Sequence, residues 1–204
     1  MPLLPALADR RASRAFSSQP VPLDAQELLW RAVSVAPSRG NSQPTRLLIA
    51  RSEAVRKALE ASLAEGNRTW ASAAPLFVAI AVNPTHDGVE TNSDGSEREM
   101  WGYHAGIATG NLMAQATALG LIAHPMSKFD EVAARTVFAT PDDVRLMAIM
   151  AIGYPGSPES LPPDLQEREK MPQDRLPLTN LVAEDRWGPE HSVSARDLRP
   201  RKNQ

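Results

Sequence analysis

Apolar residues are grouped along the chain in runs that predict a central β-sheet. Leu76–Val82 and Leu146–Ile152 are almost continuously apolar and rich in β-forming residues, which is typical of strands buried on both faces. Arg46–Ala50 and Ile122–Pro125 are shorter runs of the same kind. Four strands are therefore predicted.

Helices are predicted in the stretches between these strands. Ser52 and Asp130 are expected to cap two of them, and Gly120 is expected to end the longest. The predicted helices are Leu3–Arg10, a helix that starts at Asp24 with Glu27 as its capping partner, Ser52 to about Gly66, Glu97–Leu119, and Asp130 to about Phe138. The polar segment Asn83–Gly95 predicts a mobile loop. Together these elements indicate a mixed sheet sandwiched by helices.

Length and proline content define the domain organisation. A chain of 204 residues is long enough for one substantial core and short for two, so residues 1–204 are predicted to form a single domain. Many of the 18 prolines cluster between Tyr154 and Pro177 and recur toward the C-terminus. Residues from about 155 to 204 are therefore predicted to be a Pro-rich C-terminal arm with a flexible end.

Charge and residue usage exclude several classes of function. The formal net charge is −2, which gives no general attraction to nucleic acid or to an anionic membrane. There are no cysteines, and the four histidines are scattered without metal-ligand spacing. No run of about 20 apolar residues would span a bilayer, and the N-terminus lacks the regions of a signal peptide. We expect a cytoplasmic protein with no nucleic-acid, membrane or metal partner.

Three arginines lie within five residues, at Arg10, Arg11 and Arg14. Guanidinium groups at this spacing repel one another unless an anion lies among them, and their planar forks suit a phosphate group. The cluster therefore indicates a phosphate site. A solvated basic stretch is the other interpretation. Binding of nucleic acid by this cluster and the tail Arg196–Lys202 is a third, which the net negative charge and the absence of aromatic residues among the arginines disfavour.

The segment Ala36–Pro44 follows a predicted helix, precedes a strand and is crowded with turn residues and amide side chains. Asn41 and Gln43 each present a donor and an acceptor side by side, which suits the edge of a heterocycle or a chain of hydroxyl groups. The alternative is an ordinary connecting loop whose amides bond to their own backbone.

Together these two segments resemble the N-terminal signature of the FMN-dependent nitroreductase family. The signature is Arg-Arg-x-x-Arg-x-Phe at residues 10–16, followed by Ala-Pro-Ser-x-x-Asn-x-Gln-Pro at residues 36–44. Further matches are Ala105-Gly-Ile-Ala, Asn111-Leu-Met, Ala118-Leu-Gly-Leu, Pro125 with Phe129-Asp130, Ile152-Gly-Tyr-Pro and Arg175-Leu-Pro-Leu. Residues from about 8 to 184 are thus covered in the expected order.

The resemblance implies an α+β fold with three α/β/α layers around a central mixed, mainly antiparallel sheet, in a domain-swapped homodimer. It also implies an FMN site made of three groups of residues. The phosphate group would lie at Arg10, Arg11, Ala12 and Arg14, joined by Arg175. The flavin would be contacted from the other subunit by Pro37, Ser38 and Arg39, with Asn41 and Gln43 beside them. The segment along the isoalloxazine, with a backbone N–H directed at N5, would be Pro125, Met126, Ser127 and Lys128.

Four positions depart from the family pattern. A serine is usual at Ala12, a tryptophan at Thr45 and a second basic residue at Gln173, and Ser127-Lys128 replaces an acidic-Gly type of pair. The first three changes remove a hydroxyl, packing and a charge. We expect the affinity for phosphate to survive these losses, and FMN to bind more weakly than in tighter-binding members. Lys128 is either a charge beside the N1–O2 edge, where it would stabilise reduced flavin, or a solvated lysine.

The resemblance implies an FMN-dependent NAD(P)H oxidoreductase. Either NADH or NADPH would be the reductant, and small electron-poor acceptors such as nitroaromatics or quinones would be reduced by ping-pong hydride transfer. No side chain is needed as a nucleophile or metal ligand, because flavin N5 carries the hydride. Asn83–Gly95 and residues near Trp70 and Trp101 are candidates for a lid over the pocket. The alternatives are a same-fold enzyme that breaks down flavin or dehalogenates aromatics, and a non-catalytic flavin-binding protein.

Overall fold

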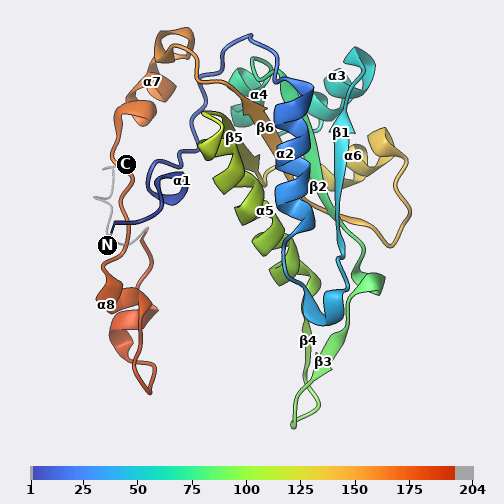
Figure 1. Ribbon diagram of the computed structural model, residues 1–204, viewed down its shortest axis with the longest axis vertical. Helices are drawn as coiled ribbons and strands as arrows, with labels where there is room; N and C mark the ends of the chain where they lie inside the picture. The colour runs from blue at the N-terminus through green and yellow to red at the C-terminus, as the bar shows by residue number, and fades with distance from the viewer. Residues whose placement is uncertain (1, 196–204) are drawn as a thin grey trace. The chain divides into compact units, whose positions relative to one another are not determined.

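The structure, a computed structural model, describes residues 2–195 (Figure 1). The strands are β1 (Thr45–Ala50), β2 (Leu76–Val82), β3 (Val89–Thr91), β4 (Glu97–Glu99), β5 (Ile122–Met126) and β6 (Arg145–Gly153). The α-helices are α1 (Pro5–Ala8), α2 (Leu23–Ser34), α3 (Glu53–Ala61), α4 (Glu65–Ala71), α5 (Trp101–Ala118), α6 (Glu131–Phe138), α7 (Pro163–Lys170) and α8 (Leu178–Leu181). The short 3-10 helices are η1 (Arg39–Asn41), η2 (Pro84–His86), η3 (Pro158–Ser160) and η4 (Pro189–Ser192).

Four of the strands form one sheet in the order β1-β2-β6-β5. All seven residues of β2 are buried, as the continuous apolar run predicts for a central strand. β2 pairs with β6 from Leu76–Ile152 to Val82–Arg145, with a register shift after Ile80. Each strand pairing in residues 2–195 is antiparallel, so the sheet predicted as mixed and mainly antiparallel is wholly antiparallel in the described part of the chain.

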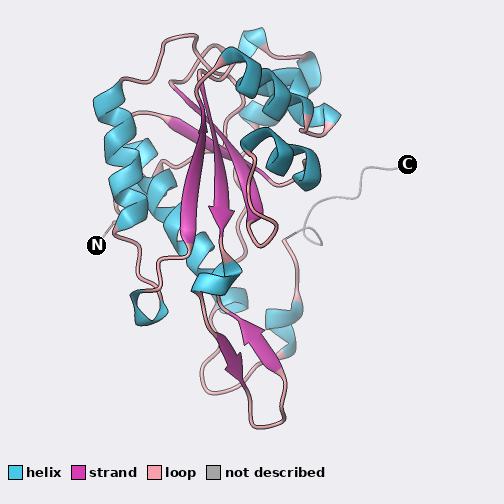
Figure 2. Cartoon of the chain, turned by 90° about the vertical axis from the view of Figure 1, so that its right-hand side faces the viewer, coloured by secondary structure: helices cyan, strands magenta, loops and turns pink. Residues whose placement is uncertain are grey.

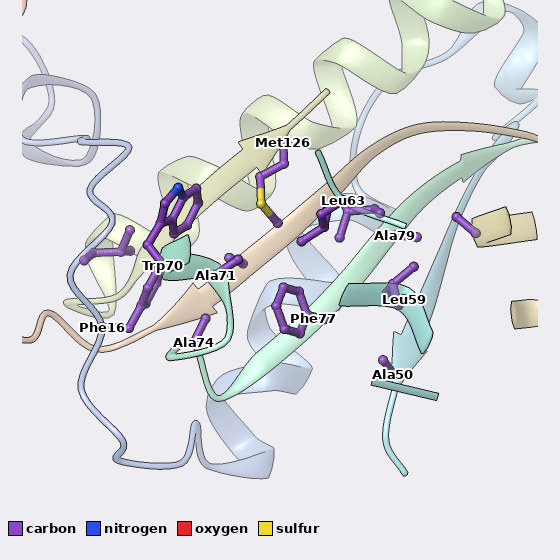
Figure 3. Packing of buried hydrophobic residues seen from close by; sticks show 14 of the residues in the cluster. Phe16, Ala50, Leu59, Leu63, Trp70, Ala71, Ala74, Phe77, Ala79 and Met126 are labelled. Atoms are coloured by element: carbon purple, nitrogen blue, oxygen red, sulfur yellow. The ribbon is translucent and has the colours of Figure 1, made fainter. Parts of the chain in front are cut away.

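Helices cover both faces of this sheet (Figure 2), which confirms the predicted α/β/α layers. Alternate residues of β2 face opposite sides: Phe77 belongs to one buried cluster and Val78 to the other. The cluster around Phe77, drawn in Figure 3, includes residues of α3, α4, α6 and α7. The cluster around Val78 includes residues of α2 and α5.

Two of the predicted helix caps are confirmed and one is wrong. The side chains of Ser52 and Asp130 accept hydrogen bonds from the backbone N–H groups of Val55 and Ala133, at 3.3 and 3.0 Å. The pair Asp24 and Glu27 does not cap α2, which begins at Leu23 after Pro22 and has no side-chain cap. The Asp24 carboxylate instead accepts from the adjacent Ala25 N–H at 2.7 Å.

Two other predicted boundaries are corrected by pairing between distant segments. The helix predicted from Ser52 to Gly66 ends at Ala61, and α4 starts anew at Glu65, because residues 62–63 pair with residues 129–130. The predicted mobile loop Asn83–Gly95 contains β3, which forms a hairpin with β4. For that reason α5 begins at Trp101 rather than at Glu97.

The chain divides into two compact units, one up to Glu169 and one from Lys170. Residues 155–169, the first part of the predicted arm, belong to the first unit, and Leu161 and Leu165 are buried in its core. In the second unit, the Asn180 amide donates to the Glu190 carbonyl at 2.6 Å. The predicted flexible end and the tail Arg196–Lys202 lie outside the described residues. No helix within residues 2–195 combines the length and apolarity needed to cross a membrane.

Candidate functional site

The segment that was predicted to bind phosphate, residues 10–14, leads into a stretch that is fixed beside the end of β6. The backbone N–H of Ser17 donates to the Tyr154 carbonyl, and that of Gly156 donates to the Ala15 carbonyl, each at 2.9 Å. A Cβ at Gly156 would lie 2.4 Å from the backbone of Phe16, so this close approach requires glycine. The Phe16 ring stacks on Trp70 with a centroid distance of 6.2 Å (Figure 3).

Three donors of this segment converge on one carboxylate, that of Glu169 in α7. Arg14 donates to Glu169 Oε1 from its guanidinium at 2.8 Å and from its backbone N–H at 3.2 Å. The Ser13 hydroxyl bonds to Oε2 of the same carboxylate. The Glu169 side chain is only 8% exposed. A guanidinium, a hydroxyl and a backbone N–H are the donors that bind oxyanions, so these residues have the chemistry of a phosphate site.

Ser13 is a candidate phosphate ligand that the sequence pattern missed. The family serine aligns with Ala12, where one hydroxyl to the phosphate was expected to be missing. The structure shows that the neighbouring Ser13 hydroxyl points to the same carboxylate as Arg14. The serine was visible in the sequence, but only the backbone conformation shows where its side chain points.

His124 connects the phosphate segment to the segment predicted to lie along the isoalloxazine. Its Nδ1 donates to the Ser13 carbonyl at 3.0 Å, and its ring lies 4.4 Å from that of Trp70. Burial lowers the pKa of His124 from its usual 6.5, and the nearby Arg14 charge lowers it further, against the Ser13 carbonyl, which raises it. Since Pro125 follows directly, residues 10–14 and 125–128 are brought together. Trp70 is 3% exposed and belongs to the core, so it is not itself part of a lid, and a lid formed by residues near it stays a prediction.

Residues 125–128 lie at the end of the edge strand β5. The Met126 side chain is 2% exposed and packs into the core, so only its backbone can face a flavin. Ser127 and Lys128 are exposed. The Lys128 carbonyl accepts from the Ala64 N–H at 3.0 Å and from the Asn67 amide at 3.4 Å. Asn67 was not predicted as a site residue, because α4, which carries it, was not predicted either.

The loop of residues 37–43 borders a cavity of about 360 Å³ between α2, β1 and α5. Residues of this loop on the cavity wall are Pro37, Ser38 and Gln43, and His104 of α5 lies on the same wall. Arg39 and Asn41 are exposed. The backbone N–H of Arg39 donates to His104 Nε2 at 3.2 Å. The contact of this loop with flavin from the other subunit stays a prediction.

The remaining predicted phosphate ligands are placed differently. Arg10 is half-buried, and Arg11 is exposed. Arg175 belongs to the second unit, where its guanidinium donates to the Gln173 side chain at 2.6 Å and to the Asp174 carbonyl at 2.9 Å. Its part in phosphate binding stays a prediction. Residues 2–195 contain no group of three His, Cys, Asp or Glu side chains that could hold a metal ion.

Comparison with known proteins identifies the family. The model of the Nitroreductase family matches residues 7–74 and 62–154. This chain belongs to the Nitroreductase family. A solved structure described as an oxidoreductase containing FMN is 31% identical with a TM-score of 0.80, covering 92% of this chain and 94% of that one.

Two curated relatives agree with this assignment. A Streptomyces coelicolor protein provisionally named NADH dehydrogenase/NAD(P)H nitroreductase is 27% identical over 178 residues, which are 78% of this chain and 88% of the relative. A Thermus thermophilus protein named NADH dehydrogenase is 27% identical over 201 residues, 87% of this chain and 93% of the relative. The family and these names support a flavin-dependent oxidoreductase.

Proposed function

We propose that this nitroreductase-family protein is an FMN-dependent NAD(P)H oxidoreductase that reduces small electron-poor acceptors by ping-pong hydride transfer. Nitroaromatics and quinones are the acceptor classes to test first. The observation that carries the proposal is the convergence of the Ser13 and Arg14 donors on a carboxylate, beside the strand β5 that leads into the exposed residues Ser127 and Lys128. The FMN in the description of the solved relative and the nicotinamide cofactors in the names of the curated relatives support it.

The donor set suits the phosphate of FMN. Ser13 and Arg14 already bind a carboxylate, which carries the same kind of oxygen acceptors as a phosphate. Arg10 and Arg11 precede them in the chain, and Arg175 would complete the basic cluster. FMN, when bound there, supplies the centre that accepts and donates hydride. Because the Glu169 carboxylate uses the same donors, it has to leave them when a phosphate binds.

The protein's own groups would orient the flavin and tune its charge. The backbone of Ser127 and Lys128, anchored through Ala64 and Asn67, would lie along the ring. Lys128 would place its ammonium at the edge where negative charge develops on reduction. The reductant and the acceptor would use the same open face in turn, so no separate nicotinamide domain is required.

A homodimer is part of the proposal. Leu23 and Val35 at the two ends of α2 are each 74% exposed, and Tyr103 of α5 is 62% exposed. We propose that these side chains lie in a surface that another protein covers. A second copy of this chain there would also carry Pro37, Ser38 and Arg39 to the partner's flavin. Size-exclusion chromatography with light scattering measures this directly, and a monomer at micromolar concentration would contradict it.

The decisive experiment is the absorption spectrum of the purified protein, with the heat-released chromophore identified by chromatography and mass. We expect about one FMN per subunit, bleached anaerobically by NADH or NADPH. Bound FMN that neither reductant bleaches would favour the non-catalytic flavin-binding alternative. A colourless protein that cannot be reconstituted with FMN would overturn the proposal.

A further inference from the structure

Asp87 and His104 form a buried acid–imidazole pair that the proposed chemistry does not use. Their side chains are 1% and 4% exposed, and Asp87 Oδ2 lies 2.5 Å from His104 Nδ1. Asp87 lies two residues before β3, and His104 lies in the first turn of α5. Burying a carboxylate is costly unless it is paired and hydrogen-bonded. Asp87 meets this condition through His104, and the question is what a buried pair at this position does.

The second ring nitrogen of His104 contacts the predicted flavin loop. The Arg39 backbone N–H donates to Nε2 at 3.2 Å. A backbone N–H can only donate, so Nε2 has to be the acceptor and the ring hydrogen lies on Nδ1, toward the carboxylate. Asp87 therefore fixes the tautomer of His104, and that tautomer holds the backbone of Arg39.

Asp87 makes a second connection to the same loop. Its Oδ1 accepts from the Gly88 N–H at 3.0 Å and from the Ser42 hydroxyl at 3.3 Å. The Arg39 side chain forms an ion pair with Glu90 of β3. A Cβ at Gly88 would come within 2.2 Å of the Arg39 guanidinium. The base of the hairpin thus holds both ends of η1.

The loop needs this support because of its backbone conformation. Gly40, Asn41 and Gln43 have φ values of 54, 58 and 46°. The left-handed region is disfavoured for residues with a Cβ, and such residues persist there only where their surroundings fix them. One such support lies within the loop, where the Ser38 hydroxyl accepts from the Gln43 N–H at 2.8 Å.

We propose that Asp87 and His104 are positioning residues that hold the Ser38–Gln43 loop in the shape that contacts the flavin. They do so through the Nδ1–H tautomer of His104, which leaves Nε2 free to accept from the Arg39 backbone. This inference rests on the proposed function, since it takes FMN as the ligand of the loop. A pair that only stabilises the fold is the competing explanation. If the pair positions the loop, a change of the His104 tautomer alters FMN binding. If the pair only stabilises the fold, that change alters the free energy of unfolding alone.

Nuclear magnetic resonance of the wild-type imidazole nitrogens tests the tautomer without any substitution. The chain has four histidines, so the resonances can be assigned with single His variants. We expect His104 to carry hydrogen on Nδ1 and a bare, accepting Nε2, in the FMN-loaded protein. Hydrogen on Nε2 would overturn the inference, because Nε2 could then not accept from Arg39.

Asp87→Asn tests the connection with almost no change of volume. If the new NH₂ group faces Nδ1, the ring hydrogen has to move to Nε2, where it meets the Arg39 N–H. If the amide oxygen faces Nδ1 instead, the NH₂ group meets the Gly88 N–H. One contact is lost either way. If binding of FMN has to restore the loop's shape against this loss, we expect FMN to bind about tenfold more weakly. The visible circular dichroism of bound flavin should change as well.

Two comparisons between variants separate an effect on the position of the loop from an effect on the stability of the fold. Asp94→Asn makes the same substitution at the exposed tip of the hairpin and should change neither readout. His104→Gln keeps an amide oxygen that can accept from Arg39, so it should retain more FMN affinity than His104→Leu, which cannot accept.

Each outcome decides one question. Wild-type affinity and flavin dichroism in both Asp87→Asn and His104→Leu, with only a lower Tm, would overturn the inference and leave the proposed function standing. A wild-type protein that binds no FMN would overturn the proposed function instead. If both variants fail to fold, Ser42→Ala, which removes only the hydroxyl contact to Asp87, replaces them: we expect weaker FMN binding, and unchanged binding contradicts the proposal.

Discussion

Replacing Glu169 by Gln should strengthen the binding of FMN and leave the binding of riboflavin unchanged. The carboxylate occupies the donors of Ser13 and Arg14, and a phosphate group has to displace it. Riboflavin has the same ring and ribityl chain without the phosphate. It therefore measures every contribution to binding except the one that Glu169 opposes.

The size of the effect follows from the bonds that Glu169 makes. A hydrogen bond to a charged group is worth about 1.5–3 kcal/mol in net terms. A glutamine retains part of the three contacts as a neutral group, and the Arg14 side chain is 26% exposed, so solvent screens part of the charge interaction. We therefore take the lower end for the change in free energy of FMN binding, about 1.5 kcal/mol, which is about a tenfold lower Kd. For riboflavin we expect a change of less than about twofold on the same reasoning.

Titration of apoprotein with each flavin, followed by quenching of flavin fluorescence at fixed ionic strength, gives both affinities. Glu167→Gln removes the same charge from an exposed position of the same helix and is the matched control. Equal changes for FMN and riboflavin, or no change for either, would refute competition at the phosphate site. Weaker binding of FMN alone would show that Glu169 supports the phosphate site rather than opposing occupancy.

Three further predictions concern assembly and stability. Val35→Glu should shift the proposed homodimer toward monomer in light scattering, whereas Val132→Glu, equally exposed on α6, should not. Gly156→Ala should lower the free energy of unfolding by about 1–3 kcal/mol, because its Cβ overlaps the Phe16 backbone, and an unchanged denaturant midpoint would contradict this. Burial lowers the folded-state pKa of His124, so the unfolded chain binds the proton more tightly and stability should fall as pH drops below about 6.5. His124→Phe should flatten that slope in denaturant titrations between pH 7 and 5, and an unaltered slope would place its origin in other groups.

The elements that could be predicted from sequence are those whose signal is local. The strand Leu76–Val82 is recognisable because both of its faces are buried, and the caps Ser52 and Asp130 because each acts on the turn that follows. The hairpin β3–β4 was not predicted, since its strands are three residues long and each residue of Glu97–Glu99 is exposed. Its pairing depends on the turn rather than on apolar alternation.

The candidate site was predictable only in part, for a related reason. The arginine cluster and the amide-rich loop are each short, so their composition is visible in one stretch of sequence. The partners that hold them are remote: Glu169 is 155 residues from Arg14, and Asp87 is 17 residues from His104 across the hairpin. No spacing rule connects such positions, and only the fold brings them together.

The base and the tip of the β3–β4 hairpin make separate sets of contacts, which matters for engineering. The base carries the contacts to the Ser38–Gln43 loop. The tip is closed by its own bonds: the Asn92 N–H donates to the Ser96 carbonyl at 2.8 Å and the Gly95 N–H to the Asn92 carbonyl at 3.0 Å. The tip can therefore be lengthened, shortened or randomised while Asp87 and Gly88 stay in place. A library confined to residues 92–96 would vary the hairpin on an intact scaffold, and the same separation would let natural variants diverge at the tip without disturbing the Ser38–Gln43 loop.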